Sequence, residues 1–526
     1  MGSLRARFAW IALAIAAEVI ATHGQSAVER HVIFQNVGLP AVDEGLIVDE
    51  THAPNTRETR KRAAIRAALT RQTGRPAVRC VPGRVVVKFR EQATEDDRLS
   101  AVASVSRTAT ITPRPSYADF DLVSIDPAAD TEAAAATLAD LPAVEYAQAS
   151  YAGWRTLMVP NDPLYATRQW NLPLINLERA WDLQPQAGSA ITVAVLDTGV
   201  AYQNATLIEN IPAFRDDDGN RYPALGRVTI PYAGAAQLMA PSRFVSPYDF
   251  IWNNAVPLDY DGHGTHVTGT IGQLTNDGIG TAGVAFNVKI MPVKVIDGVW
   301  DFLFGAPNIA TDDVVARGIR YAADNGANII NMSIGRTGPP DSSAVIEGAI
   351  QYAVSKGVFF AIASGNGFEE GNPLEVIAEI ASRVDGAVSV AAVDRNRAHA
   401  YYSTTGSYVE LSAPGGSERG FGRDGFVFQQ TFDFNFTDTF LLPPTQYTAP
   451  RFDVHAYIGY IGTSMATPHV AGVAAMMMQQ GIKSPAAIEA VLKQTAVDLG
   501  APGRDDTFGF GLVDARAALR GQGPAR

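Results

Sequence analysis

Short apolar runs alternate with stretches of helical periodicity over most of the chain after residue 190. The apolar runs are rich in Val, Ile, Ala and Phe and predict buried strands. Polar and apolar positions recur at helical spacing between several of these runs. Strands that alternate with helices in this way predict a parallel sheet covered by helices on both faces. The predicted strands are 191–197, 288–295, 328–333, 358–363 and 387–393, and the predicted helices include 311–325, 342–356 and 485–494.

The pattern between residues 79 and 150 is different. Two of its strands alternate apolar and polar residues, as an antiparallel pair would. The complete order is strand, helix, strand, strand, helix, strand, which predicts a small ferredoxin-like α+β unit. Its elements are predicted at 84–89, 95–105, 108–111, 117–125, 131–141 and 143–147.

Composition narrows the class of protein. The chain has 526 residues, of which 47% are hydrophobic and 18% charged, so it can form a large core and more than one domain. A net charge of -12 argues against nucleic acid as a main partner. The single cysteine, Cys80, excludes an intramolecular disulfide. Packing, with or without bound ions, must therefore stabilise the fold.

The first residues have the pattern of an export signal. Arg5 and Arg7 precede an apolar run at 8–17, which is too short to span a bilayer. We interpret 1–24 as a secretory signal peptide, with an uncleaved anchor as the alternative, and expect export to the extracellular or periplasmic space. Residues 25–78 are weakly patterned and are interpreted as a pro-segment or linker.

Three distant stretches carry residues suited to nucleophilic catalysis. Asp197 ends the first predicted strand, at the sheet edge where open α/β folds place their sites. His263 stands at the start of a helix, and Ser464 stands at the mouth of a buried helix that is predicted from the apolar run 473–478. If the fold unites them, Ser464 would attack a carbonyl carbon and His263 would take its proton. Asp197 would hold the tautomer of the imidazole.

These motifs resemble those of the subtilisin-like serine proteases. The chain has D-T-G, H-G-T-H-V-x-G and G-T-S-M-A-T-P-H-V-A-G in the order Asp, His, Ser, and the resemblance runs from about Asn161 to about Leu519. It implies that Asn366 donates to the oxyanion together with the backbone N–H of Ser464. It also implies a substrate cleft between two short segments, Ser333-Ile334-Gly335 and Ala363-Ser364-Gly365.

The cleft segments predict substrate preference. Their residues are small and uncharged, which indicates a roomy apolar pocket. We therefore expect broad specificity with a large apolar or aromatic residue before the scissile bond.

The resemblance also implies a zymogen. Residues 79–155 would be a propeptide that assists folding and inhibits the peptidase domain at 156–526. Self-cleavage would fall between residues 151 and 159, and the mature enzyme would be a monomer acting on proteins and peptides. A permanent accessory domain is the alternative interpretation of 79–155.

The chemistry implied by the resemblance needs no cofactor, but a structural calcium ion is expected. Its ligands would be the carboxylates of two aspartates and three backbone carbonyl groups. Thr206 replaces a further family ligand, an aspartate nine residues after the catalytic one. The expected ligands are Asp162, Leu274, Asp277, Ile279 and Thr281.

Two stretches are interpreted as insertions, 215–243 and 416–457. The second is rich in Phe, Gly and Pro, so its aromatic residues could form a wall of the cleft or a separate cluster under a loop. The sequence as a whole predicts a secreted serine endopeptidase. The alternatives are a peptide-binding pseudoprotease and an α/β-hydrolase esterase, and the esterase lacks a complete G-x-S-x-G motif.

Overall fold

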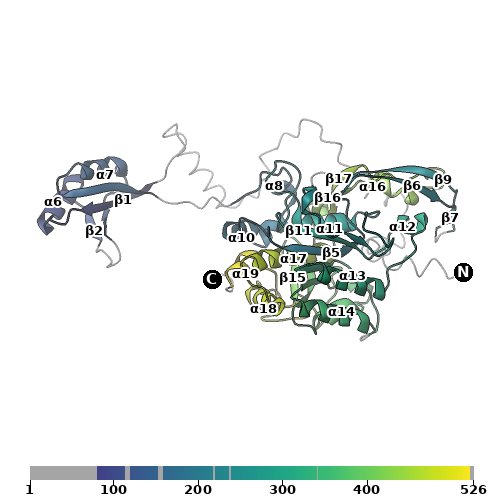
Figure 1. The fold of residues 1–526 in the computed structure, drawn as a ribbon. Helices are drawn as coiled ribbons and strands as arrows, with labels where there is room; N and C mark the ends of the chain where they lie inside the picture. Colours follow the sequence, from purple (N-terminus) through teal and green to yellow (C-terminus); the bar gives the residue numbers. More distant parts are fainter. Residues whose placement is uncertain are drawn as a thin grey trace. The chain divides into compact units, whose positions relative to one another are not determined.

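The computed structural model describes residues 80–112, 119–151, 158–216, 219–235, 238–339 and 342–521. They belong to two compact units, one within residues 47–156 and one that contains residues 157–526 (Figure 1). The predicted signal peptide, the segment 25–78 and the centre of the predicted cleavage region lie outside the described residues.

The smaller unit has the predicted order of elements. Its four strands form one antiparallel sheet in the order β2-β3-β1-β4, the arrangement of a ferredoxin-like fold. Thr94 and Asp97 form a capping box at the first helix, and Asp130 caps the second. The elements are β1 (Cys80–Phe89), α6 (Glu95–Val105), β2 (Thr110–Thr112), β3 (Asp121–Ser124), α7 (Thr131–Ala139) and β4 (Val144–Tyr151).

The larger unit is built on a seven-stranded sheet in which every neighbouring pair is parallel. The five predicted strands are all present. In spatial order the sheet contains β10 (Tyr248–Asp249), β11 (Lys289–Lys294), β5 (Thr192–Asp197), β12 (Ile329–Met332), β13 (Phe359–Ala363), β14 (Ala387–Val393) and β15 (Leu411–Pro414).

Helices cover both faces of this sheet, as the alternating pattern predicts (Figure 1). None of the helices in the described ranges is long and apolar enough to cross a membrane. The helices are α8 (Tyr165–Arg168), α9 (Asn171–Leu174), α10 (Leu177–Leu183), α11 (His263–Gly272), α12 (Val299–Phe304), α13 (Asp312–Asp324), α14 (Ala344–Ser355), α15 (Val376–Ala381), α17 (Thr463–Gln479), α18 (Pro485–Thr495) and α19 (Ala515–Arg520).

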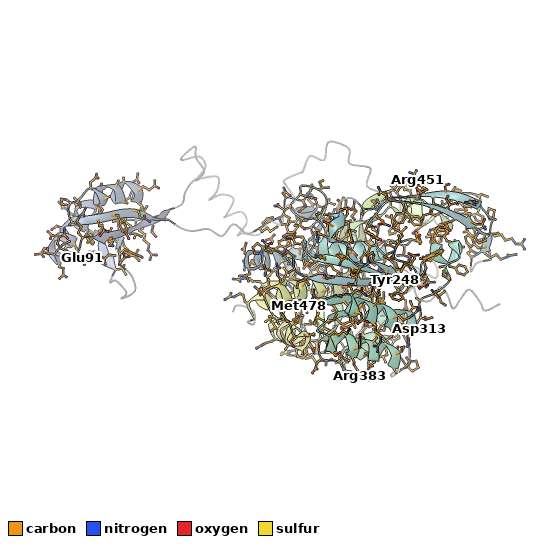
Figure 2. All side chains as sticks on the ribbon, in the orientation of Figure 1. Glu91, Tyr248, Asp313, Arg383, Arg451 and Met478 are labelled. Atoms are coloured by element: carbon orange, nitrogen blue, oxygen red, sulfur yellow. The ribbon has the colours of Figure 1, made fainter. Side chains whose placement is uncertain are left out.

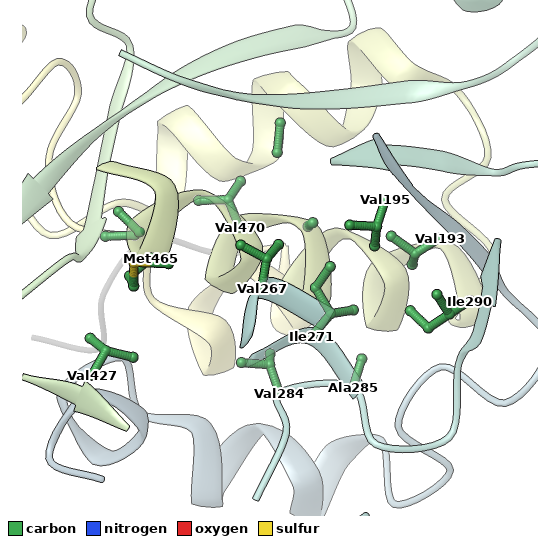
Figure 3. Close-up of a cluster of buried hydrophobic side chains, with 14 of the residues drawn as sticks. Val193, Val195, Val267, Ile271, Val284, Ala285, Ile290, Val427, Met465 and Val470 are labelled. Atoms are coloured by element: carbon green, nitrogen blue, oxygen red, sulfur yellow. The ribbon is translucent and has the colours of Figure 1, made fainter. Parts of the chain in front are cut away.

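Alternate residues of β5 enter two different hydrophobic cores. Val193 and Val195 pack in the core that contains α11 and α17, which Figure 3 shows in close-up. Ala194 and Leu196 pack in the other core, with α13 and α14. A strand that is buried on both faces needs a continuous apolar run, and this is why residues 191–197 lack an alternating pattern.

Helix α17 is buried along nearly its whole length, from Thr463 to Met478. In Figure 2 Met478 lies within the side-chain packing of the unit, whereas Arg383 lies at its edge. A buried helix has little freedom to shift, so the residues at its first turn are held rigidly against the sheet.

The two predicted insertions form small sheets that meet each other. The first insertion supplies β9 (Gly226–Tyr232), which forms a hairpin with β6 (Ala205–Ile211). It also contains the hairpin of β7 (Phe214–Arg215) and β8 (Arg221–Tyr222), apart from Phe214, which comes just before the insertion. The second contains α16 (Phe434–Thr437) and most of the hairpin of β16 (Val427–Phe432) and β17 (His455–Tyr460). The Phe452 N–H donates to the Pro231 carbonyl at 3.0 Å, which joins the two.

Buried aromatic rings fill the space between these insertions. Phe214 stacks on Tyr222 with ring centroids 4.5 Å apart, and the edge of Tyr447 meets both rings. Phe432 and Phe452 are fully buried nearby. These aromatic residues are continuous with the core that contains α11 and α17, so they do not form the separate cluster predicted as one alternative.

Candidate active site

Three neighbouring strands bring the predicted catalytic groups to one edge of the sheet. β5, β12 and β13 are adjacent, and all three run in the same direction. Asp197 is the last residue of β5, Ser333 directly follows β12, and Asn366 lies three residues beyond β13. Ser464 is hydrogen-bonded to Ser333. Since adjacent strands lie about 5 Å apart, residues distant in sequence share this edge.

The first pair of the predicted triad is formed. His263 Nδ1 lies 2.7 Å from Asp197 Oδ1, and both side chains are buried. The same carboxylate oxygen accepts the Thr198 N–H at 2.8 Å. Gly264 permits this approach, because a Cβ at that position would lie 2.2 Å from the Gly199 carbonyl oxygen. The second residue of α11 must therefore be glycine for the helix to begin so close to Asp197.

Asp259 organises the start of α11, and sequence reasoning missed it. Its Oδ1 accepts hydrogen bonds from the Thr198 hydroxyl and from the N–H groups of Asp261 and Gly262. Its Oδ2 accepts the N–H and hydroxyl of Thr265. One fully buried carboxylate thus ties the residue after Asp197 to the first turn of the His263 helix. An acidic residue four positions before a helical histidine was the available signal.

Opposing effects act on the pKa of His263. Burial by itself lowers the pKa of the imidazole. The charge of Asp197 and its hydrogen bond raise the pKa, and Asp261 and Asp259 add to this effect. The result is a pKa raised from 6.5 to about 9. The site therefore favours the imidazolium that forms when this residue accepts a proton.

The second pair of the triad differs from the prediction. Ser464 Oγ donates to the Ser333 carbonyl oxygen at 3.1 Å. His263 Nε2 is buried and has no hydrogen-bond partner in the described part of the chain. The expected continuous line of hydrogen bonds is therefore interrupted between serine and histidine.

A second hydrogen bond joins Ser464 to Ser333. Ser333 Oγ donates in return to the Ser464 carbonyl at 2.8 Å. This carbonyl can accept the bond because Pro468, four residues later in the helix, has no N–H to offer it. A proline inside α17 thus creates the attachment point for the residue that follows β12.

The amide of Asn366 is oriented by Thr463. Asn366 Oδ1 accepts the N–H and the hydroxyl of Thr463, both at 2.9 Å. Since these bonds occupy the oxygen, the Nδ2 hydrogens are the part of the amide left to donate to another group. Thr463 was not predicted as a site residue, although it precedes the serine in the G-T-S motif.

The two predicted cleft segments follow adjacent strands. Ala363 and Ser364 are buried, whereas Ile334, Gly335 and Gly365 are half-buried. The side chain of another residue, Glu375, lies between the two glycines. A Cβ on Gly365 would be 2.2 Å from Glu375 Cγ, and a Cβ on Gly335 would be 2.7 Å from Glu375 Oε2.

The expectation of an uncharged pocket is therefore wrong at this position. Glu375 follows Asn366 by nine residues and belongs to neither cleft segment. Local sequence did not reveal that the chain turns back and inserts this carboxyl group between them.

The predicted calcium ligands are brought together in part. Asp162 Oδ2 accepts the Asn276 N–H at 2.7 Å, and Asp162 Oδ1 accepts the Asp277 N–H at 3.3 Å. Burial and the neighbouring Asp277 raise the pKa of Asp162. Thr206, in place of the third acid, lies in the hairpin strand β6. The described residues contain no cluster of three or more His, Cys, Asp or Glu suited to a metal. The donors therefore fit a calcium ion only in part.

Two further histidines near the site have structural contacts. His266 Nε2 donates to the carbonyl oxygens of Val427 and Ile458, which fastens the β16–β17 hairpin to α11. His469 contacts the Met465 carbonyl at 2.8 Å and Asn171 at 2.8 Å. Burial lowers the pKa of both rings, to about 3 and about 4 respectively, so they are neutral structural groups.

Two protein-family profiles and several known proteins match this chain. The profile of the subtilase family matches residues 188–511, and that of the fervidolysin N-terminal prodomain matches 66–150. A thermophilic serine proteinase from Bacillus sp. (strain AK1) is 29% identical over 84% of this chain and 88% of that protein. Thermitase from Thermoactinomyces vulgaris is 29% identical over 69% of this chain and 99% of its own length.

The fold is also similar to that of a solved protease structure. A protease from Pseudoalteromonas arctica has 28% identity and a TM-score of 0.50, covering 69% of this chain and 98% of that one. The family match covers more than half of the 526 residues and includes the segments that carry Asp197, His263, Asn366 and Ser464. The chain therefore belongs to the subtilase family of serine proteases.

Proposed function

We propose that this protein is a secreted, self-processing serine endopeptidase in which Ser464 is the nucleophile and His263 the general base. The observation that carries the proposal is the buried 2.7 Å pair of His263 and Asp197, beside the strand end that holds Ser464. Asp197 accepts from Nδ1 and so leaves the Nε2 lone pair free to accept a proton.

The first chemical step requires one change of hydrogen bond. Ser464 Oγ rotates away from the Ser333 carbonyl and donates to His263 Nε2 as substrate binds. The oxygen attacks the scissile carbonyl carbon, and its proton passes to Nε2. Asp197 stabilises the new imidazolium. The raised pKa of His263 supports this step.

Charge on the substrate oxygen needs donors that are already in place. Asn366 Nδ2 and the N–H of Ser464 would supply them, as Thr463 occupies the amide oxygen. Collapse of the tetrahedral intermediate transfers the proton from Nε2 to the leaving amine. Water then hydrolyses the acyl-enzyme by the same route.

The ferredoxin-like unit supports a zymogen. We propose that it assists folding, occupies the substrate cleft as an inhibitor and is removed by cleavage between residues 151 and 159. The match of residues 66–150 to a prodomain supports this role. Residues 1–24 would direct export before maturation.

A pseudoprotease is the second candidate, and one observation favours it. Ser464 is hydrogen-bonded to Ser333, and the described residues provide no partner for His263 Nε2. Such a protein would bind peptides in the cleft without cutting them.

Intact-mass analysis of the wild type beside Ser464→Ala separates these functions. For an enzyme the wild type loses its first 151–159 residues and digests casein, and the variant does neither. Turnover should fall by about 10⁶-fold in the variant, since the nucleophile is lost. An uncleaved, inactive wild type would support the pseudoprotease, and a variant that matures in isolation would overturn self-processing.

A structural calcium ion is proposed as well. Asp162 and Asp277 would supply carboxylate oxygens, and Leu274, Ile279 and Thr281 would supply carbonyl oxygens. The cation would offset the repulsion between two carboxyl groups that lie close together. It would stabilise the fold and take no part in the chemistry.

A further inference from the structure

Glu375 combines deep burial with a position in the predicted substrate cleft. Only 2% of the residue is exposed. Its side chain lies between Gly335 and Gly365, close enough to both that neither position has room for a Cβ. The backbone places it there, because Glu375 pairs with Thr337 in an isolated bridge and the Val376 N–H donates to the Arg336 carbonyl at 3.0 Å.

The carboxyl group has an unused acceptor. Glu375 Oε2 is buried and has no hydrogen-bond partner in the described ranges of the chain. A buried acceptor without a donor costs about 1–3 kcal/mol, so such a group in a binding cleft indicates that a ligand supplies the donor.

The charge of Glu375 is not balanced by a dedicated cation. Arg336 lies close enough to lower the pKa of Glu375. Its guanidinium group is nevertheless committed to Asp312, with Nε to Oδ1 at 2.8 Å and Nη2 to Oδ2 at 2.6 Å. It also donates to the Ser342 hydroxyl and carbonyl. Glu375 therefore adds an acid that the local ion pair does not neutralise.

We propose that Glu375 determines the specificity of this peptidase and selects a lysine or arginine side chain immediately before the scissile bond. The inference rests on the proposed function, since the segments 333–335 and 363–365 are taken as the two walls that receive this side chain. The aliphatic stem of a lysine or arginine lies along the glycines, and its cationic end donates to Oε2. A large apolar side chain would bury the carboxyl group without a donor.

The selection depends on pH. Burial raises the pKa of Glu375 from 4.5 to about 7, against the lowering effect of Arg336. The ionisable groups near Glu375 are Arg336, with its partner Asp312, and Tyr408. Burial and the charge of Glu375 raise the pKa of Tyr408. As the pH rises above about 7 the carboxyl group ionises, and selection of a cation strengthens.

A set of matched peptides tests the proposal. The mature enzyme is assayed at pH 6 and pH 9 with tetrapeptide 4-nitroanilides that differ only in a final Lys, Arg, Phe, Leu or Ala. At pH 9 we expect kcat/KM for Lys and Arg to exceed that for Phe and Leu by about 10- to 100-fold, the usual effect of a hydrogen bond to a charged group. The ratio is smaller at pH 6. Protonation of His263 affects every substrate, so ratios at one pH cancel its effect.

Variants assign the preference to one residue. Glu375→Gln keeps the shape of the side chain and removes the charge, and it should abolish the preference for Lys and Arg. Glu379→Gln is the matched control: it removes an acid four residues later that is paired with Arg383 at the edge of the unit (Figure 2). The control should retain the wild-type ratio.

The outcomes separate the two proposals. Digestion of casein with a preference for Phe, Leu or Ala would overturn the role of Glu375 and leave the peptidase function intact. An unchanged ratio in Glu375→Gln would also overturn that role. Failure of the wild type to cleave casein and every peptide would overturn both. The wild-type ratio remains decisive if the variant does not fold.

Discussion

Two buried acids lie at the same end of the central sheet, and only the first is paired with a histidine. Asp197 is fully buried, and its Oδ1 accepts from His263 and from the Thr198 N–H. Glu375 is almost as deeply buried, and its Oε2, like Asp197 Oδ2, has no hydrogen-bond partner among the described residues. The first carboxylate is bound to a neighbour that the fold itself supplies. We propose that the substrate supplies the neighbour of the second.

The comparison shows how one fold uses burial in two ways. Burial strengthens the hydrogen bond between Asp197 and the imidazole of His263, and this interaction with Asp197, against the effect of burial itself, favours the charged imidazole. Burial of Glu375 raises its pKa, because desolvation penalises a carboxylate that lacks a donor. On our proposals, the first arrangement serves catalysis and the second serves recognition.

Of the changes that test this comparison, removing the charge of Asp197 should have the largest effect. Asp197→Asn keeps the shape but offers an amide to His263 Nδ1, so the imidazole loses its tautomer and its stabilised cation. We expect kcat to fall by about 10⁴-fold, with a much smaller change in KM. Steady-state kinetics on the Ala-ending peptide would measure this. A fall of less than tenfold would show that the pair is structural.

A smaller loss is expected at the oxyanion donor. Asn366→Ala should lower kcat by about 10²–10³-fold, because one donor to the developing charge is removed. Thr463→Val, which removes only the hydroxyl that orients the amide, should give a milder loss in the same parameter. Equal losses in both variants, with KM raised, would indicate damage to substrate binding instead.

The free energy of unfolding should depend on pH through the carboxyl group of Glu375. The folded pKa of Glu375 is raised from 4.5 to about 7, so its stabilising protonated form is fully present below 4.5 and is lost as the pH rises through about 7. Glu375→Gln should therefore stabilise the mature, inhibited enzyme at pH 8 by up to about 3 kcal/mol and have little effect at pH 4. Denaturant unfolding at both pH values measures the difference, and a destabilised variant at pH 8 would contradict it.

The pH dependence of kcat/KM should reflect the raised pKa of His263. His263 must be neutral to accept the Ser464 proton, and its pKa is raised from 6.5 to about 9. kcat/KM should therefore increase from pH 6.5 to about 9. Asp261→Asn should move this rise to lower pH, because Asp261 contributes to the raised pKa. A midpoint at or below 6.5 in the wild type would contradict the role assigned to the surrounding acids.

The smallest effect is expected from calcium. Only two carboxylates contribute to the proposed site, so micromolar calcium should be insufficient and millimolar calcium should raise Tm modestly. Asp277→Asn should abolish this rise without changing kcat. Calorimetry with calcium and with EDTA measures it, and equal Tm values would remove calcium from the proposal.

Local patterns predicted the elements because burial and capping leave direct marks in sequence. The apolar run 191–197 is continuous because both faces of β5 are covered, and Ser484 marks the start of α18 by accepting the Ala487 N–H. Motifs also identified Asp197, His263, Ser464 and Asn366 as candidates. What they could not show was the hydrogen bond of Ser464 to Ser333, since that depends on the strand order and on the carbonyl freed by Pro468.

Sequence by itself therefore determined five of the seven strands of the central sheet, the starts of several helices, the family and the chemical types available at the sheet edge. Tertiary structure alone decided that Asp259 fastens the histidine helix, that the two insertions share one aromatic cluster and that Glu375 lies between Gly335 and Gly365. The physical reason is the range of the interactions involved. Periodicity and caps arise within a few residues, whereas a carboxyl group between two strand ends depends on segments that meet only after the sheet has formed.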